Sequence, residues 1–276
     1  MTGNRETAFF AVTVSGIRYP VLGRTEFFME KALYTRPKTL RDTPMTYCPG
    51  CGHSMIHRII AELIDELDLA GKAIGIAPVG CAVTAYDFLD IDFSEAAHGR
   101  APAVATGIHR VRPDAFVFAY QGDGDLASIG LAEIIHAASR GENYTTIFVN
   151  NTIYGMTGGQ MAPTTLVGQK SSTCPAGRDA QTMGYPIRVC EMLDTLQAPA
   201  LIARTMLAGP AGIRQTKTTL RKAFQCQLQK KGFSIVEILS PCPIYMRMEP
   251  KEAMEHVQKN VSAYFPVKVF REPEGL

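Results

Sequence analysis

The sequence lacks any apolar run approaching the roughly 18 residues expected of a membrane-spanning helix. Its first apolar patch, residues 8–12, is short and has neither the basic start nor the small-residue cleavage site of a secretory signal. The net charge is only +2, so charge favours neither nucleic acid nor an anionic membrane as a partner. No internal repeat or low-complexity segment is visible. These absences predict a globular cytoplasmic protein.

The 276 residues fit one large domain better than two small ones. Hydrophobic residues make up 46% and charged residues 20%, which is enough apolar material for a sizeable core. We predict an N-terminal extension over residues 1–34, one domain over residues 35–265, and a C-terminal tail over residues 266–276.

Short apolar runs alternate with helical patterns along the chain. Strands rich in Val, Ile, Phe and Ala are predicted at residues 73–77, 115–120, 145–150, 201–206 and 233–239. Helices are predicted at residues 54–69, 102–111, 126–140, 188–196 and 212–230, with Ser54 as the N-cap of the first. This alternation favours an α/β fold with a doubly wound, mainly parallel sheet and helices on both faces. Ligands of such sheets bind at the carboxyl ends of the strands.

A Gly-Asp-Gly-Asp segment, residues 122–125, follows the second predicted strand, and Asn150-Asn151 ends the third. The glycines let the backbone approach a ligand closely, and the helix behind them directs free N–H groups at an anion. The Asp123 carboxylate, the Asn151 amide oxygen and the Ile153 carbonyl together offer oxygen ligands suited to Mg²⁺. Taken alone, Gly-Asp-Gly is also typical of a simple strand-to-helix turn with Asp123 as an N-cap.

Together these segments resemble the signature of thiamine-diphosphate enzymes. In that family the matching residues Asp123, Asn151 and Ile153 bind Mg²⁺. The resemblance implies a thiamine-diphosphate-binding fold of the diphosphate-binding type. The residues it assigns to the cofactor are Gly122, Asp123, Gly124, Asp125, Asn151, Ile153, Tyr154, Gly155, Met156, Thr157 and Gly158.

Four of the seven cysteines lie in turn-forming sequence: Cys48, Cys51, Cys81 and Cys242. In a cytoplasmic protein such cysteines more often bind metal than form disulfides. Their spacing fits zinc and a [4Fe–4S] cluster equally well, because both need four sulfur ligands. Cys174, Cys190 and Cys226 are expected to be small buried hydrophobic residues.

The sequences around these four cysteines, and residues 154–160, resemble the β subunits of the 2-oxoacid:ferredoxin oxidoreductases. That resemblance implies that the four thiolates bind a [4Fe–4S] cluster. His98-Gly99-Arg100 resembles a segment that faces the thiamine in that family, which makes His98 and Arg100 candidate catalytic residues. The alternative is a surface pair at a helix start. His53 either faces the cofactor or hydrogen-bonds its own turn.

The resemblance is strongest to the branched-chain (2-oxoisovalerate) type, with the 2-oxoglutarate type second. It implies oxidative decarboxylation of a 2-oxoacid to acyl-CoA and CO₂, with coenzyme A as co-substrate and electrons passing to ferredoxin. The chain has room for one thiamine-type domain, so we expect a partner α subunit to supply the pyrimidine side and the activating Glu. A ferredoxin-like γ or δ subunit, or ferredoxin itself, is the second expected partner. A non-redox decarboxylase or carboligase with structural zinc, and a scaffold that only relays electrons, are the alternatives.

Overall fold

The computed structural model describes residues 11–14, 17–20 and 34–275. The chain divides into two units, Met1–Thr35 and Arg36–Leu276. In the first unit, β1 (Ala11–Val14) and β2 (Ile17–Pro20) pair as an antiparallel hairpin. The rest of the predicted N-terminal extension, apart from Tyr34, lies outside the described residues.

The second unit is built on a seven-stranded sheet with the order β11-β9-β10-β6-β5-β3-β4. Every neighbouring pair is parallel except β11–β9. The strands are β3 (Ala73–Ala77), β4 (Asp92–Glu95), β5 (Phe116–Gly122), β6 (Thr145–Asn150), β9 (Leu201–Met206), β10 (Ser234–Leu239) and β11 (Lys268–Arg271). A separate antiparallel pair consists of β7 (Ile153–Tyr154) and β8 (Gln160–Met161).

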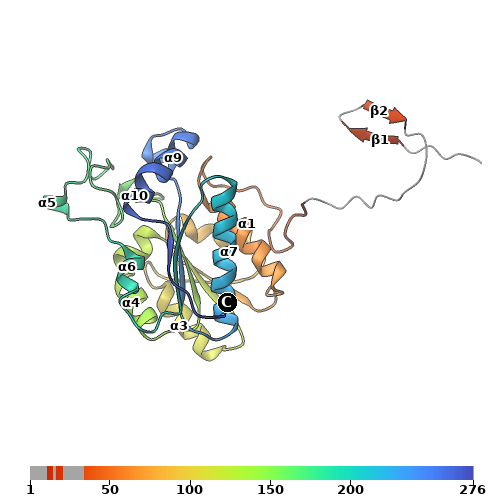
Figure 1. Cartoon of the computed structure of the whole chain (residues 1–276), viewed down its shortest axis with the longest axis horizontal. Coiled ribbons are helices and arrows are strands. Elements are labelled where there is room, and N and C mark those ends of the chain that lie inside the picture. The colour runs from red at the N-terminus through yellow and green to blue at the C-terminus, as the bar shows by residue number, and fades with distance from the viewer. Residues whose placement is uncertain (1–10, 15–16, 21–33, 276) are drawn as a thin grey trace, which may run out of the picture. The chain divides into compact units, whose positions relative to one another are not determined.

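Helices cover both faces of the sheet (Figure 1). One face packs against α1 (His53–Glu66) and α7 (Gly209–Leu228), and the other against α3 (Ala101–Val111), α4 (Leu131–Ser139) and α6 (Val189–Leu193). The remaining helices are short: α2 (Ala85–Phe88), α5 (Ala180–Met183), α8 (Pro243–Met246), α9 (Pro250–His256), α10 (Ser262–Tyr264), the 3₁₀ helix η1 (Cys81–Thr84) and the π-helical turns η2 (Asp125–Ile129) and η3 (Val257–Val261). The doubly wound α/β fold predicted from the sequence is therefore confirmed.

Two sequence predictions about the elements are wrong. The first helix begins at His53 with Gly52 at its N-cap position, so Ser54 lies inside the helix and is not the cap. The C-terminal segment is not simply a tail, because β11 pairs antiparallel with β9 at the edge of the sheet. The four residues of β11 lie between Pro266 and Pro273, and a run this short does not predict a strand.

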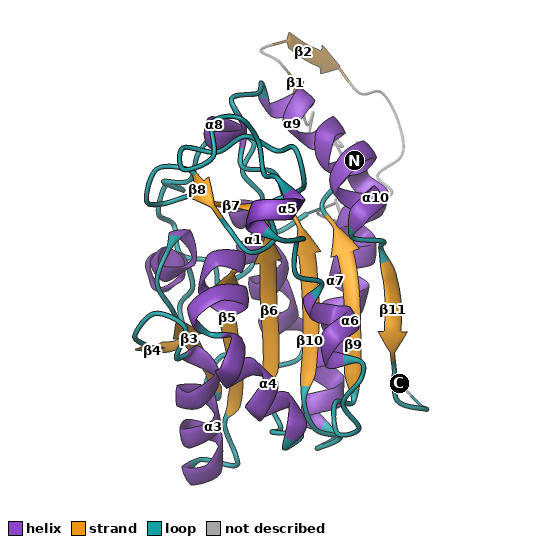
Figure 2. Cartoon of the chain, turned by 90° about the vertical axis from the view of Figure 1, so that its left-hand side faces the viewer, coloured by secondary structure: helices purple, strands orange, loops and turns teal. Residues whose placement is uncertain are grey.

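The carboxyl ends of the parallel strands lie together along one side of the sheet, which we call its carboxyl edge. The short elements β7, β8, α5, α8 and α9 gather there (Figure 2). The apolar strand interiors fix this arrangement: β5, β6, β9 and β10 are buried almost throughout. Such strands must be covered on both faces, so polar loop residues concentrate at the strand ends. No helix in the described part of the chain is long and apolar enough to cross a membrane.

Candidate active site at the carboxyl edge of the sheet

Four adjacent strands bring distant parts of the sequence together at this edge. Gly122 at the end of β5 is in register with Val149 of β6, and Asn150 at the end of β6 is in register with Leu239 of β10. The strand β3 lies on the other side of β5. The segments that leave these strands carry Cys81, Asp123, Asn151 and Cys242, which therefore meet at one place.

A cavity of about 100 Å³ opens over the ends of β5 and β6. Its walls include residues 122–125, 151 and 153–157, which are ten of the eleven residues that the sequence assigned to the cofactor. Gly158, the eleventh, does not line it. Three further stretches complete the wall: His53, residues 79–82 and His98. The cavity is thus formed where the Gly-Asp-Gly-Asp and Asn-Asn segments meet.

Asp123 is buried, with 2% of its surface exposed. One carboxylate oxygen accepts the backbone N–H of Gly124 (2.9 Å), and the other accepts the hydroxyl of Thr164. Burial raises the pKa of this carboxyl to about 7, despite these hydrogen bonds. A charged carboxylate here needs a cation, which Mg²⁺ would provide. The donor set of this wall therefore fits the metal that the sequence predicts.

The Asn150-Asn151 segment is held from behind by a buried ion pair. The Asn150 side-chain amide donates to Glu237 (2.7 Å), and the Arg204 guanidinium donates to the other oxygen of Glu237 (2.8 Å). Asn150 also accepts the backbone N–H of Thr152 (3.1 Å), whose φ is +62°. Arg204 and Glu237 are almost fully buried, and a buried pair with several hydrogen bonds fixes its neighbours in one arrangement.

Glycines set how closely the loops approach one another. A side chain on Gly124 would collide with the ring of Tyr154, whose hydroxyl donates to the Gly124 carbonyl (3.1 Å). A Cβ on Gly155 would lie 3.4 Å from the Cys81 sulfur and 3.5 Å from the Cys242 sulfur. Gly155 therefore lies directly against two of the predicted cluster ligands.

The four turn cysteines line a second cavity of about 210 Å³. Cys48, Cys51, Cys81 and Cys242 are thus brought together from three separate parts of the sequence. Burial raises the pKa of Cys51 to about 11 and that of Cys242 to about 12, and it also raises the pKa of Cys81. Burial thus favours the protonated thiol at these three positions, and a bound metal would favour the thiolate instead.

The two cavities adjoin. Both are lined by His53, Cys81, Asn151, Gly155 and Met156. A group held by the cysteines and a group held over Asp123 would therefore share one wall, a few side chains thick.

His53 belongs to this wall. Its Nδ1 is hydrogen-bonded to the Tyr120 hydroxyl, and its ring stacks on Tyr47 with centroids 4.9 Å apart. Burial lowers the pKa of His53 to about 4, so the ring is neutral near pH 7. Of the two sequence interpretations, its position in both cavities favours the cofactor-facing one.

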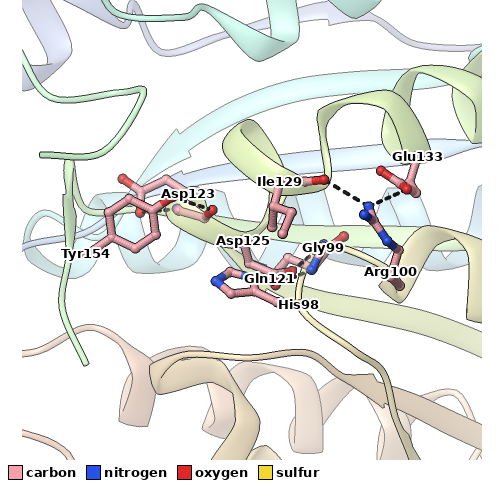
Figure 3. A network of polar contacts seen from close by, with 10 residues as sticks. His98, Gly99, Arg100, Gln121, Asp123, Asp125, Ile129, Glu133 and Tyr154 are labelled. Carbon is pink, nitrogen blue, oxygen red and sulfur yellow. Dashed lines mark hydrogen bonds and ion pairs between the residues drawn. The ribbon is translucent and has the colours of Figure 1, made fainter. Parts of the chain in front are cut away.

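Of the two candidate catalytic residues, one lines the cofactor cavity and one does not. Figure 3 shows His98 beside Asp125, and Arg100 beside Glu133. His98 lines the cavity and is bonded through Nδ1 to Asp125 (2.5 Å). The Arg100 guanidinium instead donates to Glu133 and to the Ile129 carbonyl (2.9 Å). Arg100 is thus paired within the protein, and the geometry gives no support to its predicted role at phosphate or substrate.

Thr157 and the three remaining cysteines are also accounted for. The Thr157 hydroxyl donates to Gln160 (2.6 Å) rather than pointing free into the loop. Cys174, Cys190 and Cys226 are buried and line neither cavity.

Sequence reasoning missed Thr164 and Gln121. Thr164 orients the Asp123 carboxylate, and the Gln121 amide donates to Asp125 (2.6 Å). Thr164 is 41 residues from Asp123 along the chain, in a loop whose only signal is a pair of threonines after proline. Gln121 was visible only as a polar residue at the end of a buried strand.

Comparison with known proteins agrees with this geometry. A family model described as thiamine pyrophosphate enzyme, C-terminal TPP binding domain, matches residues 79–238. The ketoisovalerate oxidoreductase subunit VorA of Methanothermobacter thermautotrophicus is 50% identical over 254 residues, covering 88% of this chain and 53% of that protein. The chain therefore spans about half the length of that relative.

A second relative matches over most of its own length. The 2-oxoglutarate synthase subunit KorB of Methanocaldococcus jannaschii is 35% identical over 223 residues, covering 79% of this chain and 78% of that protein. Among solved structures, the 2-oxoglutarate:ferredoxin oxidoreductase from Magnetococcus marinus, with 2-oxoglutarate, coenzyme A and succinyl-CoA bound, matches with a TM-score of 0.71. It is 27% identical, and the match covers 91% of this chain and 89% of that one.

Proposed function

Because the chain belongs to the 2-oxoacid:ferredoxin oxidoreductase subunits that carry the thiamine pyrophosphate-binding domain, we propose that it is the cofactor-binding subunit of such an enzyme. The reaction is oxidative decarboxylation of a 2-oxoacid to acyl-CoA and CO₂, with electrons leaving through an iron–sulfur cluster to ferredoxin. The observation that carries this proposal is the wall shared by the two cavities. A cluster held by the cysteines would then lie next to the place where the 2-oxoacid would react.

The cofactor cavity would hold the diphosphate and Mg²⁺ of thiamine diphosphate. Asp123, Asn151 and the Ile153 carbonyl are the metal ligands in this proposal. Residues 122–124 and 154–158 provide backbone groups and small side chains around the phosphates. When bound, thiamine diphosphate supplies the carbanion chemistry of 2-oxoacid decarboxylation. The chain contributes position, charge balance at Asp123 and a largely enclosed wall.

The cysteine cavity would hold a [4Fe–4S] cluster on Cys48, Cys51, Cys81 and Cys242. Support for a cluster over a single zinc ion comes from the relatives, which are named as 2-oxoacid oxidoreductase subunits and so need a redox group. The non-redox alternative with structural zinc is left to the metal analysis below. A purely electron-relaying scaffold is disfavoured by the cavity over Asp123, which such a protein would not need.

The substrate is proposed to be 2-oxoisovalerate or a related branched-chain 2-oxoacid, since the ketoisovalerate relative is 50% identical. The 2-oxoglutarate type is the second candidate, from the KorB relative and the Magnetococcus structure. Coenzyme A is the proposed acyl acceptor.

We further propose that the active site is completed by an α subunit. The described residues that line the two cavities include no glutamate, so the Glu that activates the cofactor would come from that partner. A ferredoxin-like subunit or ferredoxin would take the electrons, in the cytoplasm.

Metal analysis tests the cluster. Protein purified without oxygen should contain about four irons and four sulfides per chain, as expected of one [4Fe–4S] centre. Single Cys→Ala changes at Cys48, Cys51, Cys81 and Cys242 should lower the iron content, whereas Cys226→Ala, in the core away from both cavities, should not. Zinc in place of iron would support the non-redox alternative.

Calorimetric titration with Mg²⁺ and thiamine diphosphate tests the other cavity. Asp123→Ala removes the only carboxylate proposed to bind the metal and should weaken cofactor binding at least about 100-fold, a loss of roughly 2.7 kcal/mol. The control is Asp114→Ala, which removes a surface carboxylate that pairs with Arg112. Unchanged binding by Asp123→Ala would show that the metal site is wrongly assigned.

A further inference from the structure

His98 and Asp125 form a hydrogen-bonded pair in the wall of the cofactor cavity. His98 precedes α3, and Asp125 opens the π-helical turn η2. The two side chains meet at 2.5 Å between Nδ1 and a carboxylate oxygen. Both residues line the cavity that contains Asp123 and Asn151. π-Helical turns occur often at functional sites, because they displace a side chain from its regular helical position.

The carboxylate of Asp125 is fully engaged by the protein. The oxygen that meets His98 also accepts the backbone N–H of Gly99 (2.7 Å), and the other oxygen accepts the Gln121 amide (2.6 Å). Only 3% of the residue is exposed. Three donors therefore satisfy its oxygens without a metal ion. This bonding commits Asp125 to the protein rather than to the cofactor, the role that the resemblance assigned to it.

The backbone around the pair is tightly fitted. Gly99 has a φ of +76°, and a Cβ there would lie 2.6 Å from the backbone nitrogen of Gly130, beyond the end of η2. The segment carrying His98 is thus pressed against the turn carrying Asp125, backbone against backbone. Arg100 adds a second link between the two segments, because its guanidinium donates to the Ile129 carbonyl and to Glu133.

His98 has its other ring nitrogen free for a ligand. Its side chain is 35% exposed, and no hydrogen bond to Nε2 is found in the described part of the chain. A carboxylate partner places a hydrogen on Nδ1, which fixes the tautomer and the plane of the ring. In Figure 3 the ring projects toward the side of the site where Asp123 and Tyr154 lie, while Arg100 lies on the other side with Glu133.

We propose that Asp125 is a positioning residue: it holds His98 with a hydrogen on Nδ1, so that Nε2 faces the bound cofactor or 2-oxoacid. The inference rests on the proposed function, because it assumes that the cavity holds that cofactor. Asp125 acts through His98 and does not touch the cofactor. Gln121 and the Gly99 N–H keep the carboxylate in place. The repeated Asp of the Gly-Asp-Gly-Asp segment thus has two roles, a metal ligand at Asp123 and an imidazole partner at Asp125.

The first test needs no change to the pair. Nitrogen-15 NMR of histidine-labelled chain should show a hydrogen on Nδ1 of His98, with the signal assigned by its loss in His98→Asn. In Asp125→Asn the preference for that hydrogen should be lost. An Nδ1 without hydrogen in the unchanged protein would overturn the proposal, even if no Asp125 variant could be purified.

The second test is a double-mutant cycle on the complete, partner-bound enzyme. Asp125→Asn keeps the shape and should lower kcat about 10- to 100-fold, the usual loss when the partner that orients a functional imidazole is removed. Its affinity for thiamine diphosphate with Mg²⁺ should stay within about threefold. In a His98→Ala background the same change should have almost no further effect, because both changes remove one unit. Asp114→Asn is the matched surface control.

Two results would overturn the proposal. The first is a loss of cofactor affinity beyond about tenfold in Asp125→Asn with full iron content, which would make Asp125 a cofactor ligand. The second is a double variant whose loss of kcat equals the product of the losses in Asp125→Asn and His98→Ala, which would mean that the two residues act independently. Failure of the proposed function looks different: the unchanged chain would then bind no thiamine diphosphate, while the NMR result would still decide the pairing.

Discussion

At the scale of single residues, His57 is a fully buried titratable group near the site. Its Nε2 is hydrogen-bonded to the Tyr47 hydroxyl (2.7 Å), and its ring packs against Phe88 and Tyr120. Its Nδ1 is buried without a partner among the described residues. Burial lowers the pKa of His57 well below the usual value, with a further contribution from His53.

This environment predicts acid sensitivity. Because the folded state holds His57 neutral, the unfolded chain binds more protons below about pH 6.5, and the free energy of unfolding falls as the pH falls. His57→Gln keeps an acceptor or donor for Tyr47 but cannot titrate. Between about pH 6 and 5, its free energy of unfolding should fall less steeply than that of the unchanged protein, by up to about 1.4 kcal/mol per pH unit. Denaturant titrations under argon measure the slopes.

His109→Gln is a comparison variant in which a smaller effect on the pH slope is expected. Burial lowers the pKa of His109 too, but this histidine is only partly buried, so its removal should flatten the slope less. Equal slopes for His57→Gln and the unchanged protein would mean that His57 takes up its proton without unfolding.

The site residues that the sequence predicts best are those that belong to short, continuous motifs. Asp123 and Asn151 stand in short motifs at the ends of apolar strands, and the structure brings them to one cavity. Thr164, Gln121 and the pairing of Asp125 with His98 depend on contacts between segments that no motif links. Arg100 shows the limit of such motifs. It stands two residues after His98 in the same segment, but its guanidinium is bonded to Glu133.

At the scale of elements, the segment before α3 approaches η2 backbone against backbone, and this contact bears on the site. Gly99→Ala should cost about 2–4 kcal/mol of unfolding free energy, because it combines a left-handed backbone with a collision against the Gly130 backbone. Gly107→Ala lies within α3, where a Cβ meets nothing within 4 Å. It should stabilise by roughly 0.5–1 kcal/mol, as alanine does in a helix. Urea unfolding compares the two, and similar values would contradict the packing.

The buried strands β3, β6 and β9 begin and end where the apolar runs in the sequence do. The edge strands were not predicted. β4 reads Asp-Phe-Ser-Glu and has no buried residue, and β11 is four residues long with none either, so neither carries a run of buried side chains. Edge strands are defined by their neighbours' hydrogen bonds, which a local pattern does not contain.

At the scale of the whole molecule, the chain is proposed to be one half of a catalytic unit. Purified alone, it should contain the cluster but show no ferredoxin reduction with 2-oxoisovalerate and coenzyme A. Adding the α subunit should restore turnover, measured by the absorbance of ferredoxin. Asp123→Ala should not be restored by the same addition. Full turnover by the isolated chain would contradict the need for a second subunit.

Cys48 is exposed, whereas Cys242, another wall of the same cavity, is buried. A cluster bound there would have one side toward the cavity over Asp123 and the other side toward the solvent. Electrons would then have a short exit toward any acceptor docking over Cys48, without crossing the sheet. Dioxygen could reach the cluster by the same side, so the exposure that would let electrons leave would also make the protein sensitive to air.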